Sequence, residues 1–198
     1  RPMVGERSGA WAPGIRRARL GATGRFSHPM VLELLIPASE RLPETWCMSS
    51  RHLQRGRFSC PGSVYVLTTV TRARRPLFDR ASNAEIVVEC LRDIERAGIS
   101  HTFAWVVMPD HVHWLLQLRQ GTLGACMQRF KSRSSRLIGQ AAGSVPRLWQ
   151  PSYFEHVLRS DESLLKQARY IAANPVRAGL VDRLGVYPFA WCRWPMDP

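Results

Sequence analysis

Residues 101–118 constrain the fold of this chain more than any other part of its sequence. They contain two apolar runs, HTFAWVVM (101–108) and HVHWLLQL (111–118), separated only by Pro109 and Asp110. Both runs are rich in β-branched and aromatic residues, and a two-residue Pro-Asp connection is typical of a tight turn. We therefore expect an antiparallel β-hairpin, and hence a fold centred on a sheet.

The segments around this hairpin show further strand and helix patterns. SVYVLTTVT (63–71) predicts a strand, and residues 153–159 a short extended piece. Helical periodicity covers three segments: 82–97, 123–139 and 161–173. The expected caps and stops are Ser82, Gly98, Ser160 and Pro175. This order of elements predicts an α+β fold, a ferredoxin-like antiparallel sheet with helices packed on one face.

Residues 1–60 differ in composition from the rest of the chain. They are rich in Gly, Pro, Ser and Arg and show no sustained periodicity. We expect them to form a basic, poorly ordered N-terminal extension. Residues 61–198 then form a single domain, long enough to bury a core.

The charge balance indicates a polyanionic partner. The chain has 28 basic and 15 acidic residues, a net charge of +13 and a pI of about 10.9. Such an excess favours binding to nucleic acid. All basic residues except Lys131 and Lys166 are arginine, so GC-rich coding bias is an alternative origin of the charge.

The cysteines and the apolar runs bear on the compartment. The five cysteines include no CxxC pair, which argues against a disulfide framework or a zinc knuckle and fits a reducing cytosol. No apolar run approaches the roughly 20 residues that span a bilayer. We expect a cytoplasmic protein, associated with the nucleoid through DNA and not with a membrane.

His111 and His113 are the most specific chemical feature. Alternation along a strand projects both imidazoles from one face, while Val112 and Trp114 pack on the other. Two convergent neutral imidazoles can hold a divalent cation. The alternative is a histidine pair on a half-exposed strand that only hydrogen-bonds its neighbours.

Tyr170 is the second candidate. In the predicted helix it shares a face with Lys166 and Asn174, four residues to either side. A phenol there can attack phosphorus and become an ester where a metal draws charge from the phosphate. Asn174 could add an oxygen ligand and Lys166 could favour the phenolate. The alternative is a tyrosine at the edge of the core.

Basic residues predict a path for DNA. Helix 123–139 places three arginines at i, i+4 and i+7, and no acid interrupts residues 120–150. The predicted DNA-contacting residues are Arg72, Arg74, Arg75, Arg129, Lys131, Arg133, Arg136 and Lys166. Candidates for stacking on unpaired bases are Trp149, Tyr153 and Phe154, of which we expect at least two in the core.

Four stretches together resemble a known family. FAWVVMPDHVHWLLQL, MQRFKSRSSRLIG, LWQPSYFEHVLRS and ARYIAANPVRAGLV follow one another in the order and approximate spacing of the REP-associated tyrosine transposases, a bacterial branch of the single-tyrosine HUH transposases. The resemblance extends over about residues 60–192 and includes TTVTRARRPLF (68–78). Residues 1–60 depart from the family pattern.

The resemblance implies a site and a reaction. His111 and His113 would be the HUH pair that holds Mg²⁺ or Mn²⁺, and Asn174 a further polar ligand. Tyr170 would be the nucleophile, leaving a 5′-phosphotyrosine link and a free 3′-OH. The partners would be single-stranded, hairpin-forming DNA, the repetitive extragenic palindromes.

Three alternatives remain open at this point. The chain could be a domesticated protein that grips hairpin DNA without cutting it. It could be an unrelated metallohydrolase that uses His111, His113 and an acid such as Glu155. A relaxase or rolling-circle initiator shares the chemistry, but the sequence shows no helicase or primase segment. Whether the protein is a monomer or a homodimer is left open.

Overall fold

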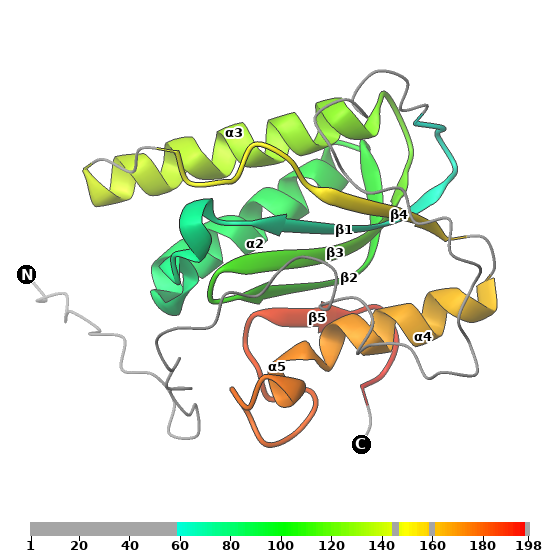
Figure 1. Ribbon diagram of the computed structural model, residues 1–198. Helices are drawn as coiled ribbons and strands as arrows, with labels where there is room; N and C mark the ends of the chain where they lie inside the picture. Colours follow the sequence, from blue (N-terminus) through cyan, green and yellow to red (C-terminus); the bar gives the residue numbers. More distant parts are fainter. Residues whose placement is uncertain (1–58, 144–146, 159–160, 197–198) are drawn as a thin grey trace, which may run out of the picture. The chain divides into compact units, whose positions relative to one another are not determined.

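The computed structural model describes residues 59–143, 147–158 and 161–196 (Figure 1). The extension expected over residues 1–60 lies almost wholly outside these ranges, as does the cap expected at Ser160. No helix among the described residues combines the length and hydrophobicity that a bilayer crossing requires. The described cysteines are all unbridged: Cys60, Cys90, Cys126 and Cys192.

A five-stranded antiparallel sheet forms the centre of the fold, in the order β4-β1-β3-β2-β5 (Figure 1). The strands are β1 (Val64–Val70), β2 (Ser100–Met108), β3 (His111–Leu118), β4 (Phe154–Leu158) and β5 (Ala190–Cys192). The predicted hairpin is confirmed, because β2 and β3 pair across the Pro109-Asp110 turn. The order β4-β1-β3-β2 is that of a ferredoxin-like sheet, and β5 is added beside β2.

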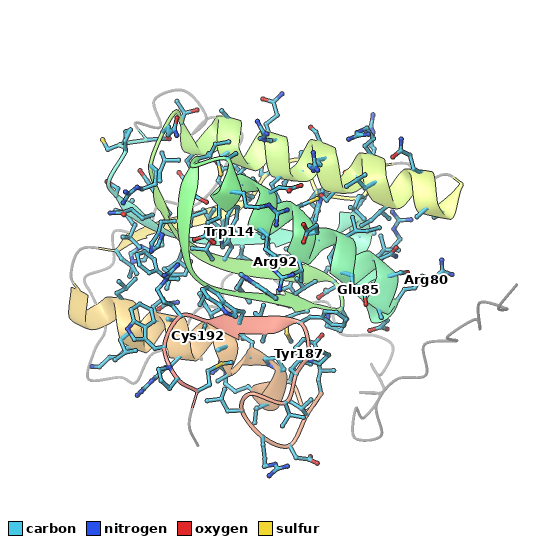
Figure 2. All side chains as sticks on the ribbon, turned by 180° about the vertical axis from the view of Figure 1, so that it is seen from behind. Arg80, Glu85, Arg92, Trp114, Tyr187 and Cys192 are labelled. Atoms are coloured by element: carbon cyan, nitrogen blue, oxygen red, sulfur yellow. The ribbon has the colours of Figure 1, made fainter. Side chains whose placement is uncertain are left out.

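Helices cover both faces of the sheet. The α-helices are α2 (Ala81–Arg96), α3 (Leu123–Ala142), α4 (Asp161–Ala172) and α5 (Asn174–Arg177), and two 3₁₀ turns follow β1, η3 (Arg72–Arg74) and η4 (Leu77–Asp79). α2 and α3 share one face, where Trp114 of β3 meets Phe130 of α3 at 5.8 Å between ring centroids. α4 lies against the opposite face (Figure 1, Figure 2).

The predicted α+β class and antiparallel sheet are confirmed, but the expectation of helices on one face holds only for α2 and α3. The physical reason is that the central strands are apolar on both faces. Val106 and Val107 are neighbours in β2, point to opposite faces, and are both fully buried. A sheet with this pattern needs a layer on each side, and α4 supplies the second one.

The helix boundaries differ from the predicted ones at four ends: both ends of α2, by one residue each, and the C-terminal ends of α3 and α4, by three residues and one. α2 begins at Ala81, so the expected N-cap at Ser82 is wrong, since that residue is already helical. α2 ends before Gly98, whose φ of +69° is the left-handed conformation expected of a helix stop. α4 ends at Ala172, and Pro175 falls in α5, as expected of a residue that cannot continue a helix.

Trp149 closes the core between the end of β1 and α3. It is 7% exposed and forms an isolated bridge with Thr71. Its indole Nε1 donates to Oγ of Ser134 at 2.9 Å, and the Ser134 hydroxyl donates to the carbonyl of Phe130 at 2.8 Å. The segment that follows α3 is thereby attached to the helix through one buried hydroxyl.

We expect Ser134→Ala to lower the free energy of unfolding by about 1–3 kcal/mol, because it leaves the buried indole N–H of Trp149 without an acceptor. Urea denaturation followed by tryptophan fluorescence measures the change. Ser132→Ala, the same substitution at an exposed position of α3, is the control and should change stability by less than about 0.5 kcal/mol. Equal effects of the two substitutions would contradict this role for Ser134.

Candidate active site

The two histidines of β3 lie side by side on the face covered by α4. Their ring centroids are 4.8 Å apart, with the planes at 83°. Val112 and Trp114, the alternate residues, are buried on the other face. The structure therefore brings the two imidazoles together, as the alternation predicted.

Each imidazole is oriented by a hydrogen bond at Nδ1. Asp110 Oδ1 lies 2.5 Å from Nδ1 of His111, and Thr68 Oγ1 lies 2.8 Å from Nδ1 of His113. When these Nδ1 atoms carry the protons, both Nε2 atoms are left as acceptors. This is the arrangement of histidines that bind metals, in which a partner at one ring nitrogen sets the tautomer and direction of the other.

The electrostatics around His113 favour neutral imidazole. Burial lowers the pKa of His113 to about 3, and the positive charges of His111 and Arg177 act in the same direction. Burial opposes the ionisation of Asp110, but hydrogen bonds and charges from His111 and Arg74 outweigh it and hold the pKa of this carboxyl below its ordinary value. A neutral nitrogen donor and an ionised carboxylate are thus adjacent.

These donors fit a divalent cation as two of its ligands. Among the described residues, no group of three or more His, Cys, Asp or Glu side chains is placed to hold a metal. Any further ligand must then be another oxygen, such as the amide of Asn174, water or a substrate phosphate. Mg²⁺ and Mn²⁺ commonly complete their coordination with water and phosphate oxygens.

Tyr170 lies on α4 beneath the guanidinium of Arg177. The Cζ atom of Arg177 is 3.8 Å from the centre of the phenol ring, and its Nη2 donates to the Tyr170 carbonyl at 2.8 Å. The Tyr170 hydroxyl is buried and has no hydrogen-bond partner among the described residues. Burial raises the pKa of Tyr170, and the nearby Arg177 opposes this.

Arg177 connects the two halves of the site. Its charge acts on His113 as well as on Tyr170, and α4 packs on β2 and β3. The strand with the imidazoles and the helix with the phenol therefore meet in one region. This juxtaposition depends on tertiary packing, since the sequence separates His113 from Tyr170 by more than an entire helix and strand.

Asn174 and Lys166 occupy different surroundings. Asn174 opens α5, and its Nδ2 donates to the Ile171 carbonyl at 3.1 Å, at the end of α4. The amide nitrogen is therefore used locally, and Oδ1 is the atom that could bind a cation. Lys166 is exposed on α4.

Two arginines after β1 are already engaged with protein groups. Arg74 Nη1 forms an ion pair with Oδ2 of Asp110 at 3.1 Å, so this carboxylate bridges Arg74 and His111. Arg75 donates from Nε to the carbonyl of Arg72 at 3.3 Å. Arg72 is exposed. Of these three, Arg74 contributes to the surroundings of the histidine pair.

Two of the four basic residues predicted on α3 to contact DNA, Lys131 and Arg133, are bound to other groups of the protein. Arg133 forms an ion pair with Asp93 of α2 at 2.5 Å. Lys131 Nζ donates at 2.8 Å to the carbonyls of both Gln150 and Ser152, and burial lowers its pKa to about 8. Arg129, Arg133 and Arg136 are the exposed members of the predicted set on α3, and of these Arg133 is the one paired with Asp93.

Glu155 does not share the histidine face. It pairs in register with Leu67 of β1, a core residue on the α2 and α3 side, whereas Thr68 lies opposite His113. Directly paired residues project to the same side of a sheet. Glu155 therefore cannot be the acid that the metallohydrolase alternative requires beside the histidines.

Three supporting residues were not identified from the sequence: Thr68, Asp110 and Arg177. Asp110 precedes His111 directly, so its adjacency is a signal that could have been used. Arg177 follows Tyr170 by seven residues, a helical spacing that its position beyond Pro175 obscured. Thr68 gives no local signal, because its place beside His113 depends on the register of β1 against β3.

The chain is similar to known transposases. A REP-associated tyrosine transposase of Escherichia coli K12 is 26% identical over 136 residues, which covers 68% of this chain and 79% of that protein. A putative REP-associated tyrosine transposase of Haemophilus influenzae Rd is 27% identical over 105 residues; this chain spans 57% of its length, and the match covers 45% of this chain.

A solved structure of a REP-associated tyrosine transposase bound to a REP hairpin matches with a TM-score of 0.59 and 25% identity, covering 72% of this chain and 82% of that one. The family described as "Transposase IS200 like" matches residues 61–174, which contain the whole hairpin, both histidines, Tyr170 and Asn174. The match spans more than half of the chain. The chain belongs to the IS200-like transposase family.

Proposed function

We propose that this transposase is a metal-dependent single-strand DNA endonuclease and strand transferase that acts on hairpin-forming palindromic DNA. The observation that carries the proposal is that the oriented histidine pair lies on the sheet face covered by α4, the helix that carries Tyr170. The hairpin bound to the similar solved structure supports the choice of DNA.

In the proposed reaction, the Tyr170 oxygen attacks a backbone phosphorus atom. A P–O bond to tyrosine forms and the bond to the 3′ oxygen breaks. The proton that the phenol loses passes through water to that oxygen, which leaves as a free 3′-OH. The 5′ phosphate remains as a phosphotyrosine ester, which the 3′-OH of another strand can attack in the reverse sense. The ester conserves the bond energy, so no ATP is consumed.

Each residue of the site has a separate role in the proposed reaction. His111 and His113 would hold a divalent cation, which supplies positive charge to the phosphate oxygens. The Arg177 guanidinium, the cation that touches the ring, partly offsets the rise in the pKa of Tyr170 that burial causes, and so makes the phenolate easier to form. Asp110 and Thr68, through their hydrogen bonds at Nδ1, would keep the two Nε2 atoms oriented toward that cation.

The Tyr170 hydroxyl is buried without a hydrogen-bond partner among the described residues, which indicates that the side chain is in a position it adopts before DNA binds. Burying a hydroxyl without a partner costs about 1–3 kcal/mol. A DNA phosphate that reaches the hydroxyl, or a displacement of α4 that exposes it, would recover that cost. Nucleophile-bearing elements often complete their site only with substrate bound.

We expect Tyr170→Phe to abolish the covalent protein–DNA product while leaving DNA binding within about twofold, because the phenol oxygen is the attacking atom. The assay incubates wild type and variant with labelled hairpin DNA and Mg²⁺ or Mn²⁺, then separates the covalent adduct on a denaturing gel. Tyr65→Phe removes a hydroxyl that accepts from the backbone N–H of Cys60, on the face of the sheet opposite the histidines, and should retain the adduct. Adduct formation by the Tyr170→Phe protein would refute the proposal, and binding without any adduct in wild type would favour the non-cleaving alternative.

We expect Asp110→Asn to weaken Mn²⁺ binding by roughly 10- to 100-fold, because it removes the carboxylate that orients His111. Isothermal titration of the protein without DNA measures this directly. Arg74→Gln should weaken Mn²⁺ binding in the same direction by a smaller factor, since Arg74 holds the other oxygen of Asp110. Glu85→Gln on α2 is the charge-matched control. Unchanged Mn²⁺ affinity in Asp110→Asn would exclude this positioning role.

A further inference from the structure

The face that carries the histidine pair extends across β1 onto β4. Thr68 lies opposite His113 on one side and opposite Phe154 on the other. Residues directly opposite in antiparallel strands project to the same side of the sheet. The hydrogen bond between Thr68 and His113 fixes that side as the histidine face. Phe154, Thr68 and His113 therefore form one row.

Phe154 is the accessible aromatic residue in this row. Its exposed fraction is 42%, whereas Trp149 is 7% exposed and Tyr153 is half-buried beside the ammonium of Lys131. Two strand spacings separate Phe154 from His113, about 10 Å. The ring thus lies near enough to the histidines for a nucleotide close to the reacting phosphate to reach it.

The backbone that leads into β4 is held in place. Lys131 ties the carbonyls of Gln150 and Ser152 to α3, and β4 pairs with β1 from Phe154 onward. A side chain at the start of such a segment is positioned before any ligand arrives. Pre-organisation of this kind lowers the entropy lost on binding.

We propose that Phe154 is a stacking platform for one unpaired base of the DNA substrate, next to the phosphate that the histidine pair receives. This inference rests on the proposed function. Every nucleobase presents a π face that can stack on a phenyl ring, so the platform accepts single-stranded DNA and excludes a base still stacked in a duplex. The base next to the reacting phosphate must therefore be unpaired in the substrate.

A second copy of the chain is the competing occupant, because β4 is an edge strand. Val157 on the same strand is 43% exposed but pairs with the core residue Tyr65 and so projects to the opposite face from Phe154. A flat partner surface on one face cannot cover both side chains. The position of Phe154 beside the histidines favours a base.

Val157 also provides a matched control. The test measures binding of a fluorescein-labelled hairpin oligonucleotide with single-stranded tails by anisotropy, in a Tyr170→Phe background so that no cleavage occurs. We expect Phe154→Ala to weaken binding by roughly 5- to 100-fold, the effect of losing one base–aromatic stack. Phe154→Trp should bind as tightly as the parent, and Val157→Ala should change affinity less than about twofold.

Abasic sites locate the base. Each tail nucleotide is replaced in turn by an abasic residue and tested against the parent and Phe154→Ala. We expect one position at which the abasic site weakens the parent but not the variant, because both changes remove the same stack. Losses of affinity that add at every position would overturn the inference. So would equal losses of affinity in Phe154→Ala and Val157→Ala. A change in the sedimentation coefficient of the DNA-free protein on Phe154→Ala substitution would overturn it too, because it would indicate that Phe154 contacts a second copy of the chain.

The two proposals fail in different ways. With Tyr170 intact and DNA at saturating concentration, Phe154→Ala should still form the covalent adduct. A wild-type protein that forms no adduct but shows the single non-additive position would refute the cleavage function and keep the stacking platform. A wild-type protein that forms the adduct but shows no non-additive abasic position would keep the cleavage function and refute the stacking platform.

Discussion

The register of β3 in the middle of the sheet is the constraint on which the rest of the structure depends. Trp114 and Leu116 are buried on the α2 and α3 face, while Leu115 is buried under α4. A slip of one residue would exchange the two faces, moving both imidazoles into the core. Because large apolar side chains fill both sides, that slip is strongly disfavoured. The packing of the core therefore fixes the direction of His111 and His113 before any metal or DNA is involved.

The sequence was sufficient wherever structure is set by neighbours along the chain. Alternation predicted the bounds of β3 and the shared face of its histidines, and helical periodicity predicted α3 from its first residue. What could not be predicted was set by contacts between distant segments. The placement of Thr68 beside His113 needs the pairing of β1 with β3, and the second helical layer follows from how both faces of the sheet are filled. The role of Asp110 lay within reach, since it adjoins the histidine that it orients.

The basic residues show why a charge count predicts a partner better than it predicts contacts. The sequence of α3 contains no acid, yet Asp93 on α2 neutralises Arg133, and Lys131 is consumed by two backbone carbonyls. Arg74 is turned toward Asp110 by a backbone in the left-handed region at Ala73 and Arg74, with φ of 56° and 51°. Such backbone is uncommon for residues with a side chain. This strained backbone brings the guanidinium of Arg74 to the carboxylate of Asp110, which hydrogen-bonds His111.

The two halves of the site differ in how they are held. The histidines belong to a strand paired on both sides, and their rings are fixed by Thr68 and Asp110. Tyr170 belongs to a helix that meets the sheet through buried apolar residues, Ala168, Ile171 and Ala172. Sliding an apolar contact disturbs fewer directional bonds than shifting a paired strand, so displacement costs least at the nucleophile. A rigid histidine pair beside a helix that can be displaced suits the proposed reaction, in which the phenol would first reach the phosphate and later carry a DNA strand to a new 3′-OH.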